Sequence, residues 1–380
     1  MAYFKIATMH SGSIQIIFLL VISIYFFIFL FIFIGWLKLR DTKSDVYFAP
    51  IKISVIIAAR NESRSIPFLL NDLYQQDYPA EFFDIIIVDD HSDQRLSDLE
   101  QLKAYPGENL IVLDLPENKE GKKQALLEGV KHSHSELVLF TDADCRIGPK
   151  WIQSFVQQYN LKSSTLLFGL VDYEHRSGFL HSFFRADLLS LVVSGAGTAS
   201  MGFATICNGA NIAIRRSVFL EHAKDLKMHI TTGDDVFLLH VAKDKYKRNI
   251  SVIKNRTGIV TTKPPENIAE FFSQRARWAS KGTAYKDPDT LSLALLVLLT
   301  NFTLVLVFIL CTSGIIHIWN AIALYLIKTI ADSLILIAGF YYFGGKKTIL
   351  LVPVYELIYP IYILIATLMG ILHLFTWKNR

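Results

Sequence analysis

The decapeptide Glu136-Leu-Val-Leu-Phe-Thr-Asp-Ala-Asp-Cys145 decides the fold of this chain. Its apolar run, Leu137–Phe140, predicts a buried strand that delivers Asp142 and Asp144, two positions apart, at its end. Because alternate residues of an extended backbone point to the same side, both carboxylates can reach one point. Such oxygen ligands suit Mg²⁺ or Mn²⁺, which bind carboxylates together with substrate phosphates. An isolated Asp-x-Asp is more often a solvated turn, so the interpretation depends on the neighbouring segments.

The segments around this strand alternate between strand and helix patterns. Apolar runs at Ile51–Ala58, Phe83–Val88 and Leu110–Leu113 predict further strands, and helical stretches separate them. This alternation predicts an α/β fold with a mostly parallel sheet. In such sheets ligands bind outside the carboxyl ends of the strands, where this chain carries its polar residues. No dinucleotide-binding or P-loop glycine motif occurs, so a carboxylate-bound divalent cation is the expected way of holding phosphates.

The two ends of the chain are much more apolar than its middle. Hydrophobic residues make up 52% of the 380, and the mean hydropathy of +0.36 is too high for a simple soluble protein. Ile14–Leu37 carries no charge and is long enough to span a bilayer. Three further spans are expected at about 291–315, 319–343 and 349–375. No small-residue cleavage pattern follows the first span, so we expect a retained anchor.

This distribution predicts four parts of the chain. They are an N-terminal transmembrane anchor at 1–39, a cytosolic domain at 40–265, an amphipathic interfacial helix at 266–288 and a C-terminal transmembrane region at 289–380. Most basic residues beside the spans fall on one side if the middle domain is cytosolic, in keeping with the positive-inside rule. These are Lys38, Arg40, Lys281, Lys286, Lys346 and Lys347, whereas Lys378 and Arg380 fall on the other side. We therefore predict an integral protein of the bacterial cytoplasmic membrane.

The remaining charges and the cysteines exclude some kinds of site. A net charge of +4 is too slight to predict nucleic-acid binding, and basic residues near the spans suit membrane lipids with anionic head groups. Lys328 and Asp332 lie one helical turn apart in the third span, so we expect an internally neutralised pair, and Glu356 lies in the fourth. The three cysteines lack metal-ligand spacing and fit a reducing compartment.

Three polar groups follow the Asp-x-Asp along the chain. Cys207–Arg216 contains a glycine turn before a strand-like run, and Thr231–Asp235 presents a second acid pair at the start of a helix. Gln274-Arg-Ala-Arg-Trp278 lies in a helical stretch that mixes aromatic and basic residues, a composition typical of a helix at the membrane surface. Taken singly, the acid pair is as well explained by helix capping and the Arg-Trp helix by lipid anchoring.

In this order the motifs resemble those of the inverting family-2 nucleotide-sugar glycosyltransferases. The matching segments are Val88–Ser92, Thr141–Asp144, Gly233–Asp235 and Gln274–Trp278, and the resemblance spans roughly residues 51–282. The branch that contains cellulose, hyaluronan and poly-N-acetylglucosamine synthases and ceramide glucosyltransferase shares the Q-x-x-R-W helix. The resemblance implies a GT-A domain with a mostly parallel sheet. One N-terminal and about three C-terminal transmembrane helices flank it.

The resemblance also implies a role for each matching residue. Donor nucleotide binding is implied for Ala59, Arg60, Glu62, Asp89, Asp90, Lys122 and Asp142. Contact with the donor sugar or the acceptor is implied for Asn208, Gly209, Asp234, Gln274, Arg277 and Trp278. Asp142 and Asp144 would hold Mg²⁺ or Mn²⁺, and Asp235 would be the base that deprotonates the acceptor hydroxyl. The metal and Arg277 would stabilise the leaving diphosphate.

The predicted function is hexosyl transfer from a UDP- or GDP-sugar to a lipid-linked or growing-glycan acceptor at the membrane, as in class EC 2.4. Single transfer and processive synthesis stay open, as do a homo-oligomer and an export partner, since four helices are few for a polymer channel. A metal-dependent membrane nucleotidyltransferase or phosphotransferase would use the acid pairs equally well, but gives the Arg-Trp helix no role. A transporter or structural membrane protein leaves the acids after the strands unexplained.

Overall fold

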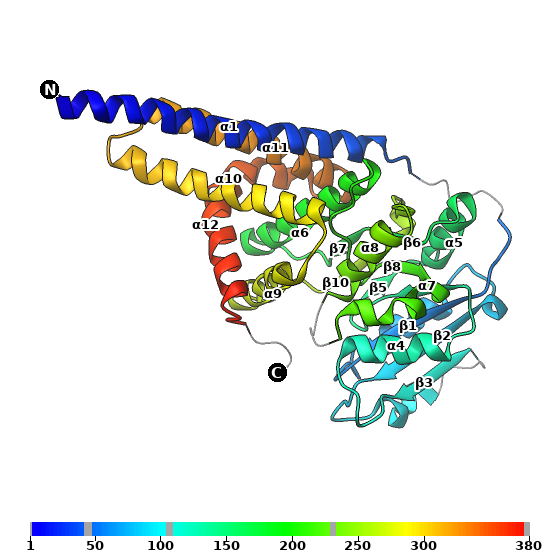
Figure 1. Cartoon of the computed structure of the whole chain (residues 1–380). Coiled ribbons are helices and arrows are strands. Elements are labelled where there is room, and N and C mark those ends of the chain that lie inside the picture. Colours follow the sequence, from blue (N-terminus) through cyan, green and yellow to red (C-terminus); the bar gives the residue numbers. More distant parts are fainter. Residues whose placement is uncertain (1, 42–47, 104–108, 229–232, 376–380) are drawn as a thin grey trace. The chain divides into compact units, whose positions relative to one another are not determined.

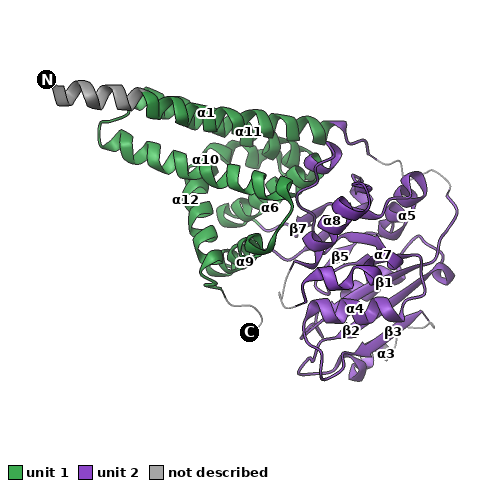
Figure 2. Cartoon of the chain, in the orientation of Figure 1, with its two compact units in different colours: residues 1–37, 177–197, 265–380 green, residues 38–176, 198–264 purple. Residues whose placement is uncertain are grey.

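The computed structural model describes residues 2–41, 48–103, 109–228 and 233–375 of the chain (Figure 1). The chain divides into two compact units (Figure 2). Unit 1 comprises residues 1–37, 177–197 and 265–380, and unit 2 comprises residues 38–176 and 198–264. Each unit is therefore assembled from segments that lie far apart in the sequence.

Unit 2 is built on a seven-stranded sheet with the order β3-β2-β1-β4-β8-β6-β9. The strands are β1 (Ile53–Ala59), β2 (Phe83–Asp89), β3 (Leu110–Asp114), β4 (Leu137–Phe140), β6 (Leu166–Gly169), β8 (Ile212–Arg215) and β9 (Ile250–Ile253). β3, β2, β1 and β4 are parallel, whereas β8 runs antiparallel to both β4 and β6. The predicted α/β fold with a mostly parallel sheet is thereby confirmed.

A small second sheet and six helices complete unit 2. The three-stranded sheet has the order β5 (Arg146–Ile147), β10 (Val260–Thr262), β7 (Val171–Tyr173). The helices are α2 (Ile66–Tyr74), α3 (Glu100–Lys103), α4 (Lys122–His132), α5 (Trp151–Lys162), α7 (Arg216–Glu221) and α8 (Asp234–Lys245). The β-branched and aromatic residues of the central strands are buried, Ile56 and Ile86 completely, because helices cover the sheet.

Helix α4 packs closely on the sheet at Gly129. A Cβ at this position would lie 2.6 Å from Ile56 Cγ2 and 3.2 Å from Val88 Cγ2. We expect Gly129→Ala to lower the free energy of unfolding by about 1–3 kcal/mol, because an overpacked core has to shift. Thermal unfolding of the full chain measures the effect. The matched control is Gly148→Ala, whose Cβ would meet the Thr257 carbonyl oxygen at an ordinary 3.5 Å. Equal midpoints for the two variants would contradict the prediction.

Unit 1 is helical. Its helices are α1 (Ala2–Lys38), most of α6 (Phe179–Ser200), α9 (Ile268–Ser280), α10 (Pro288–Thr312), α11 (Ile318–Phe343) and α12 (Val352–Ile371). In the described part of the chain, five helical segments are long and apolar enough to cross a membrane. Four of them confirm the predicted N-terminal and C-terminal apolar helices. The fifth, α6, falls in the segment that we assigned to the middle domain, and its hydropathy is the lowest of the five.

Buried charged side chains join three of these helices. Lys328 Nζ on α11 lies 2.6 Å from Asp332 Oδ2 and also pairs with Glu356 on α12. Tyr25 of α1 donates a hydrogen bond of 2.6 Å to Asp332 Oδ1. The Lys328 side chain is fully buried. The neutralised pair expected within α11 is therefore present, and Glu356 and Tyr25 extend it to the neighbouring helices.

Candidate active site

The predicted site residues of unit 2 gather at one edge of the large sheet. Ala59 at the end of β1 pairs with Asp89 at the end of β2, and Phe140 at the end of β4 pairs with Ile56 of β1. Since β8 runs antiparallel to β4, its first residue, Ile212, also lies opposite Phe140. The segments after β1, β2 and β4 and the segment before β8 therefore converge at this edge, as the α/β topology requires.

Asp90 connects the loops that follow β1, β2 and β3. Its amide donates to the Ala59 carbonyl over 2.8 Å, and its Oδ1 accepts from the Gly121 amide over 2.9 Å. Arg60 Nη1 donates to the Asp90 carbonyl oxygen at 3.4 Å. Burial raises the pKa of the Asp90 carboxyl, although the Gly121 hydrogen bond and the charge of Arg60 oppose the shift. Asp90 is thus a buried acid with a fixed orientation beside Arg60.

Two of the predicted nucleotide-binding residues have structural roles nearby. Both carboxylate oxygens of Asp89 accept backbone hydrogen bonds, from Ser92 at 2.9 Å and from Leu96 at 2.8 Å. The carbonyl oxygen of Glu62 accepts from the amides of Ser65 and Ile66, at the start of α2. Asp89 therefore shapes the loop after β2.

Lys122, the first residue of α4, links the end of β4 to the start of α8. Its Nζ lies 2.5 Å from Asp142 Oδ1 and 3.7 Å from Asp234 Oδ2. Gly121 precedes the helix with a φ of 95°, a conformation that suits glycine. Burial disfavours the ammonium, but the carboxylates of Asp142 and Asp234 outweigh it and raise the Lys122 pKa. The ammonium therefore remains charged at neutral pH.

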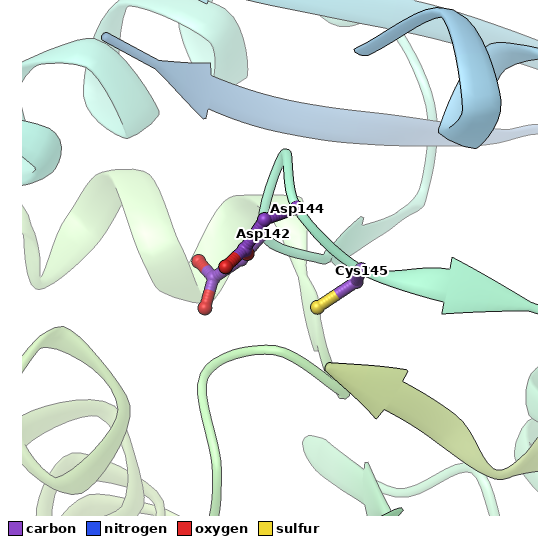
Figure 3. A group of neighbouring side chains, drawn as sticks. All are labelled: Asp142, Asp144 and Cys145. Carbon is purple, nitrogen blue, oxygen red and sulfur yellow. The ribbon is translucent and has the colours of Figure 1, made fainter. Parts of the chain in front are cut away.

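Asp142, Asp144 and Cys145 form a group on the loop between β4 and β5 (Figure 3). One donor atom from each side chain lies within 4.8 Å of the others. Burial, together with the charges of Asp142 and Asp144, raises the Cys145 pKa well above its usual value, so the sulfur carries a proton. The two partly exposed carboxylates are the donors that suit Mg²⁺ or Mn²⁺. The mutual spacing of the cysteines gives no signal for Cys145, but its place directly after Asp144 in the sequence does.

Asp234 and Asp235 occupy the first turn of α8, where the helix dipole favours acids. Asp235 Oδ2 accepts from the Gly209 amide at 3.1 Å, and the Cys207 thiol donates to the Asp235 carbonyl oxygen at 3.4 Å. A Cβ on Gly209 would lie 3.3 Å from Asp234 Oδ2, so this close approach favours glycine. The Asn208–Gly209 loop is therefore attached to the acid pair. Thr231 and Thr232 of the same predicted motif lie outside the described residues.

The Q-x-x-R-W residues lie on α9, in unit 1. Gln274 Oε1 accepts a hydrogen bond of 2.5 Å from Arg275 Nη1, and the Arg275 guanidinium carbon lies 4.2 Å from the centre of the Trp278 ring. Arg277 is half-buried on the same helix. The other predicted site residues, from Ala59 to Asp235, are all in unit 2.

Comparison with known proteins finds similarity to glycosyltransferases in the first half of the chain. Residues 54–190 match the family described as Glycosyl transferase family 2. Glycosyltransferase AglE from Haloferax volcanii is 23% identical over 192 residues, which cover 50% of this chain and 61% of AglE. Poly(ribitol-phosphate) beta-N-acetylglucosaminyltransferase TarS from Staphylococcus aureus is 32% identical over 114 residues, which cover 29% of this chain and 20% of TarS. The chain thus matches less than two thirds of the length of either relative.

One solved structure is similar over nearly the whole chain. It is the mannosyltransferase PcManGT from Pyrobaculum calidifontis, in complex with GDP-Man and Mn2+. The TM-score is 0.57 at 16% identity, and the match covers 96% of this chain and 98% of PcManGT. This likeness shows the fold, and the segment that matches the family contains Asp90, Lys122, Asp142 and Asp144. Residues 54–190 are therefore similar to Glycosyl transferase family 2, and the α/β fold of the chain is GT-A-like.

Proposed function

We propose that this protein is an inverting glycosyltransferase that moves a sugar from a nucleotide-diphosphate sugar to a lipid-linked or growing-glycan acceptor at a membrane. The observation that carries the proposal is the contact of Lys122 with Asp142 and Asp234. It joins the Asp-x-Asp, which suits a metal-bound diphosphate, to the acid pair that opens α8. The proposed diphosphate site and the proposed base would thereby lie at one edge of the sheet.

The donor is proposed to bind through residues at this edge. Asp90, held by the Gly121 amide, would accept hydrogen bonds from the base, with Ala59, Arg60 and Glu62 framing it. Asp142 and Asp144 would hold Mg²⁺ or Mn²⁺, which supplies positive charge for the diphosphate. The Lys122 ammonium adds a second positive charge beside Asp142. Positive charge at this place would stabilise the negative charge that develops on a departing nucleoside diphosphate.

Asp235 is proposed to act as the general base. A sugar hydroxyl is a poor nucleophile until it loses its proton, and a carboxylate within hydrogen-bond reach can take that proton during the attack. The hydroxyl oxygen bonds to the anomeric carbon while the bond from that carbon to the diphosphate oxygen breaks, so the configuration inverts. The Gly209 amide fixes Asp235 Oδ2, and Lys122 lies near Asp234, which fits an orienting role for Asp234.

The membrane assignment is proposed from the helices. The five long apolar helical segments suit a bilayer, and the basic residues beside them favour a cytosolic unit 2. Residues 1–39 would form the anchor, 40–265 the cytosolic domain, 266–288 the interfacial helix and 289–380 the remaining membrane region. The Q-x-x-R-W motif on α9 supports the branch of membrane synthases and ceramide glucosyltransferase, with Gln274 and Trp278 engaging the acceptor and Arg277 stabilising the departing diphosphate.

A panel of UDP- and GDP-sugars tests the function. The full chain is purified in detergent and returned to lipid vesicles. It is then incubated with each donor and with membrane extract as the source of acceptors, and the lipid and glycan products are separated. We expect release of a nucleoside diphosphate together with labelled sugar on one product class; GDP-mannose is included because PcManGT was solved with GDP-Man. Release of pyrophosphate, or transfer of the nucleotide itself, would instead support the nucleotidyltransferase or phosphotransferase alternative.

A further inference from the structure

Arg275 occupies a position that the Q-x-x-R-W motif leaves variable, yet its side chain is only 4% exposed. Arg275 contacts two of the three side chains that define the motif: it donates a hydrogen bond to Gln274 Oε1, and its guanidinium stacks on the Trp278 ring. Its guanidinium carbon also lies 4.7 Å from the centre of the Phe271 ring. A planar guanidinium that donates in its plane and stacks on its faces has little freedom to turn. Arg275 thus fixes its neighbours on α9.

Asp187, in the middle of α6, is the acidic partner of Arg275. The Arg275 Nε donates to Asp187 Oδ2, and the Asp187 side chain is 3% exposed. Asp187 Oδ1 accepts from Tyr359 at 2.7 Å and from Tyr362 at 3.1 Å, both on α12. One buried carboxylate therefore receives hydrogen bonds from two different helices, α9 and α12, and ties them to its own.

Aromatic rings enclose this ion pair. Phe184 of α6 stacks on Phe271 of α9 with ring centroids 4.3 Å apart, and Tyr362 lies 5.1 Å from the same ring. Gly370 brings α12 close to α9, since a Cβ there would lie 2.7 Å from the Ala276 carbonyl oxygen. Away from water, a satisfied ion pair is strongly directional, and removing one partner leaves a buried charge without compensation.

The two helices that the ion pair joins, α6 and α9, also follow neighbouring strands along the chain. β7 and β10 are parallel neighbours, with Tyr173 opposite Thr262. β7 leads through residues 174–178 into α6, and β10 leads through residues 263–267 into α9. Connectors of equal length thus lead into the two helices that the Asp187–Arg275 ion pair holds together. The ladder and the ion pair restrain the same two chain segments, so α9 has a defined place next to α6.

We propose that Asp187 and Arg275 are positioning residues for sugar transfer. The pair holds α9 against α6 and α12, and through Arg275 it orients Gln274 and Trp278 for the acceptor. This inference rests on the proposed function and deepens it, because it assigns part of acceptor placement to an acid in α6. The nucleotide base and the metal are assigned to unit 2 residues, and neither Gln274 nor Trp278 is assigned to the diphosphate, so the pair should affect turnover and acceptor use more than nucleotide affinity.

The test uses the full chain in lipid vesicles with the donor found in the panel. Asp187→Asn is expected to lower kcat at least tenfold and to raise the acceptor KM, while the dissociation constant of the nucleoside diphosphate changes less than twofold. Arg275→Lys, which keeps the charge, is expected to retain more activity than Arg275→Gln. The kcat of the double variant Asp187→Asn, Arg275→Gln is expected to be no lower than that of the less active single variant, because no unpaired buried charge remains.

The matched control is Asp332→Asn, another buried acid of unit 1 that accepts from a tyrosine and pairs with a cation, but on α11. It is expected to lower the thermal midpoint and leave kcat within twofold. Hydrogen exchange of residues 268–280 provides a readout independent of turnover, and should accelerate in Asp187→Asn but not in Asp332→Asn. A wild-type kcat in Asp187→Asn, or equal losses of kcat in Asp187→Asn and Asp332→Asn, would refute the positioning role of Asp187 and Arg275. If the wild type shows no turnover, the proposed function is refuted instead, and hydrogen exchange then tests whether the ion pair holds α9 in place.

Discussion

Replacing Asp235 by Asn is expected to lower kcat for sugar transfer by a factor of about 10²–10⁴, the usual contribution of a general base. The amide has nearly the same shape as the carboxylate, and its oxygen can still accept from the Gly209 amide, so the loop should stay attached to α8. It cannot take the proton of the acceptor hydroxyl. Rates of nucleoside diphosphate release and of glycosylated product measure the effect, and calorimetry measures donor affinity, which should be retained.

Asp244→Asn is the matched control for this substitution. Asp244 lies on the same helix, its side chain is 73% exposed, and it pairs with Lys245 at 2.9 Å. Because this pair lies on the solvent side of α8, we expect neither kcat nor donor affinity to change. Unchanged turnover in Asp235→Asn would refute the proposed base. Equal losses in both variants would point to damage to α8 rather than to lost proton transfer.

Removal of divalent cations is expected to have the second large effect. Charge stabilisation by a metal contributes several kcal/mol to a transition state, so chelation should reduce transfer by a factor of about 10² or more. Mn²⁺ or Mg²⁺ should restore it. Asp144→Asn should weaken metal binding and so raise the cation concentration needed for half-maximal rate, because one of two carboxylate donors on the β4–β5 loop is lost.

Asp114→Asn is the corresponding control. Asp114 also ends a strand of the large sheet, but its partner is Arg95, at 3.7 Å, and it is outside the group of Asp142, Asp144 and Cys145. Its cation dependence should equal that of the wild type. Calorimetric titration with Mn²⁺ alone gives an activity-independent measure of the same site. Full transfer in excess chelator would rule out the metal role of Asp142 and Asp144.

The sequence predicted those features that depend on local pattern. The apolar runs became β1, β2, β3 and β4, and the acids after β4 followed from the parallel topology that the alternation indicated. Contacts between distant residues had no such signal. The pairing of Lys122 with Asp142 depends on where α4 begins relative to β4, and the engagement of Asp89 by Ser92 and Leu96 depends on the path of a loop.

Helix α6 shows a second limit of pattern reading. Polar residues such as Ser182, Arg185 and Asp187 interrupt its apolar sequence, so its hydropathy falls below that of the other long helices. In the structure those positions have partners within unit 1: Arg185 donates to the Phe343 and Gly344 carbonyl oxygens, and Asp187 receives Arg275. The sequence alone does not show that other helices will satisfy these polar residues, so it gives no sign that α6 packs in a helical unit.

The Lys328, Asp332 and Glu356 cluster has a consequence for biogenesis. A charged side chain in the middle of an isolated helix costs about 2.5–3.5 kcal/mol during insertion into a bilayer, and Glu356 of α12 finds its cation only on α11. In the proposed membrane setting, α11 and α12 would therefore leave the translocon most readily as a hairpin, joined before either meets lipid alone. Tyr25 then gives the hairpin a docking point on α1, a helix that is synthesised before it.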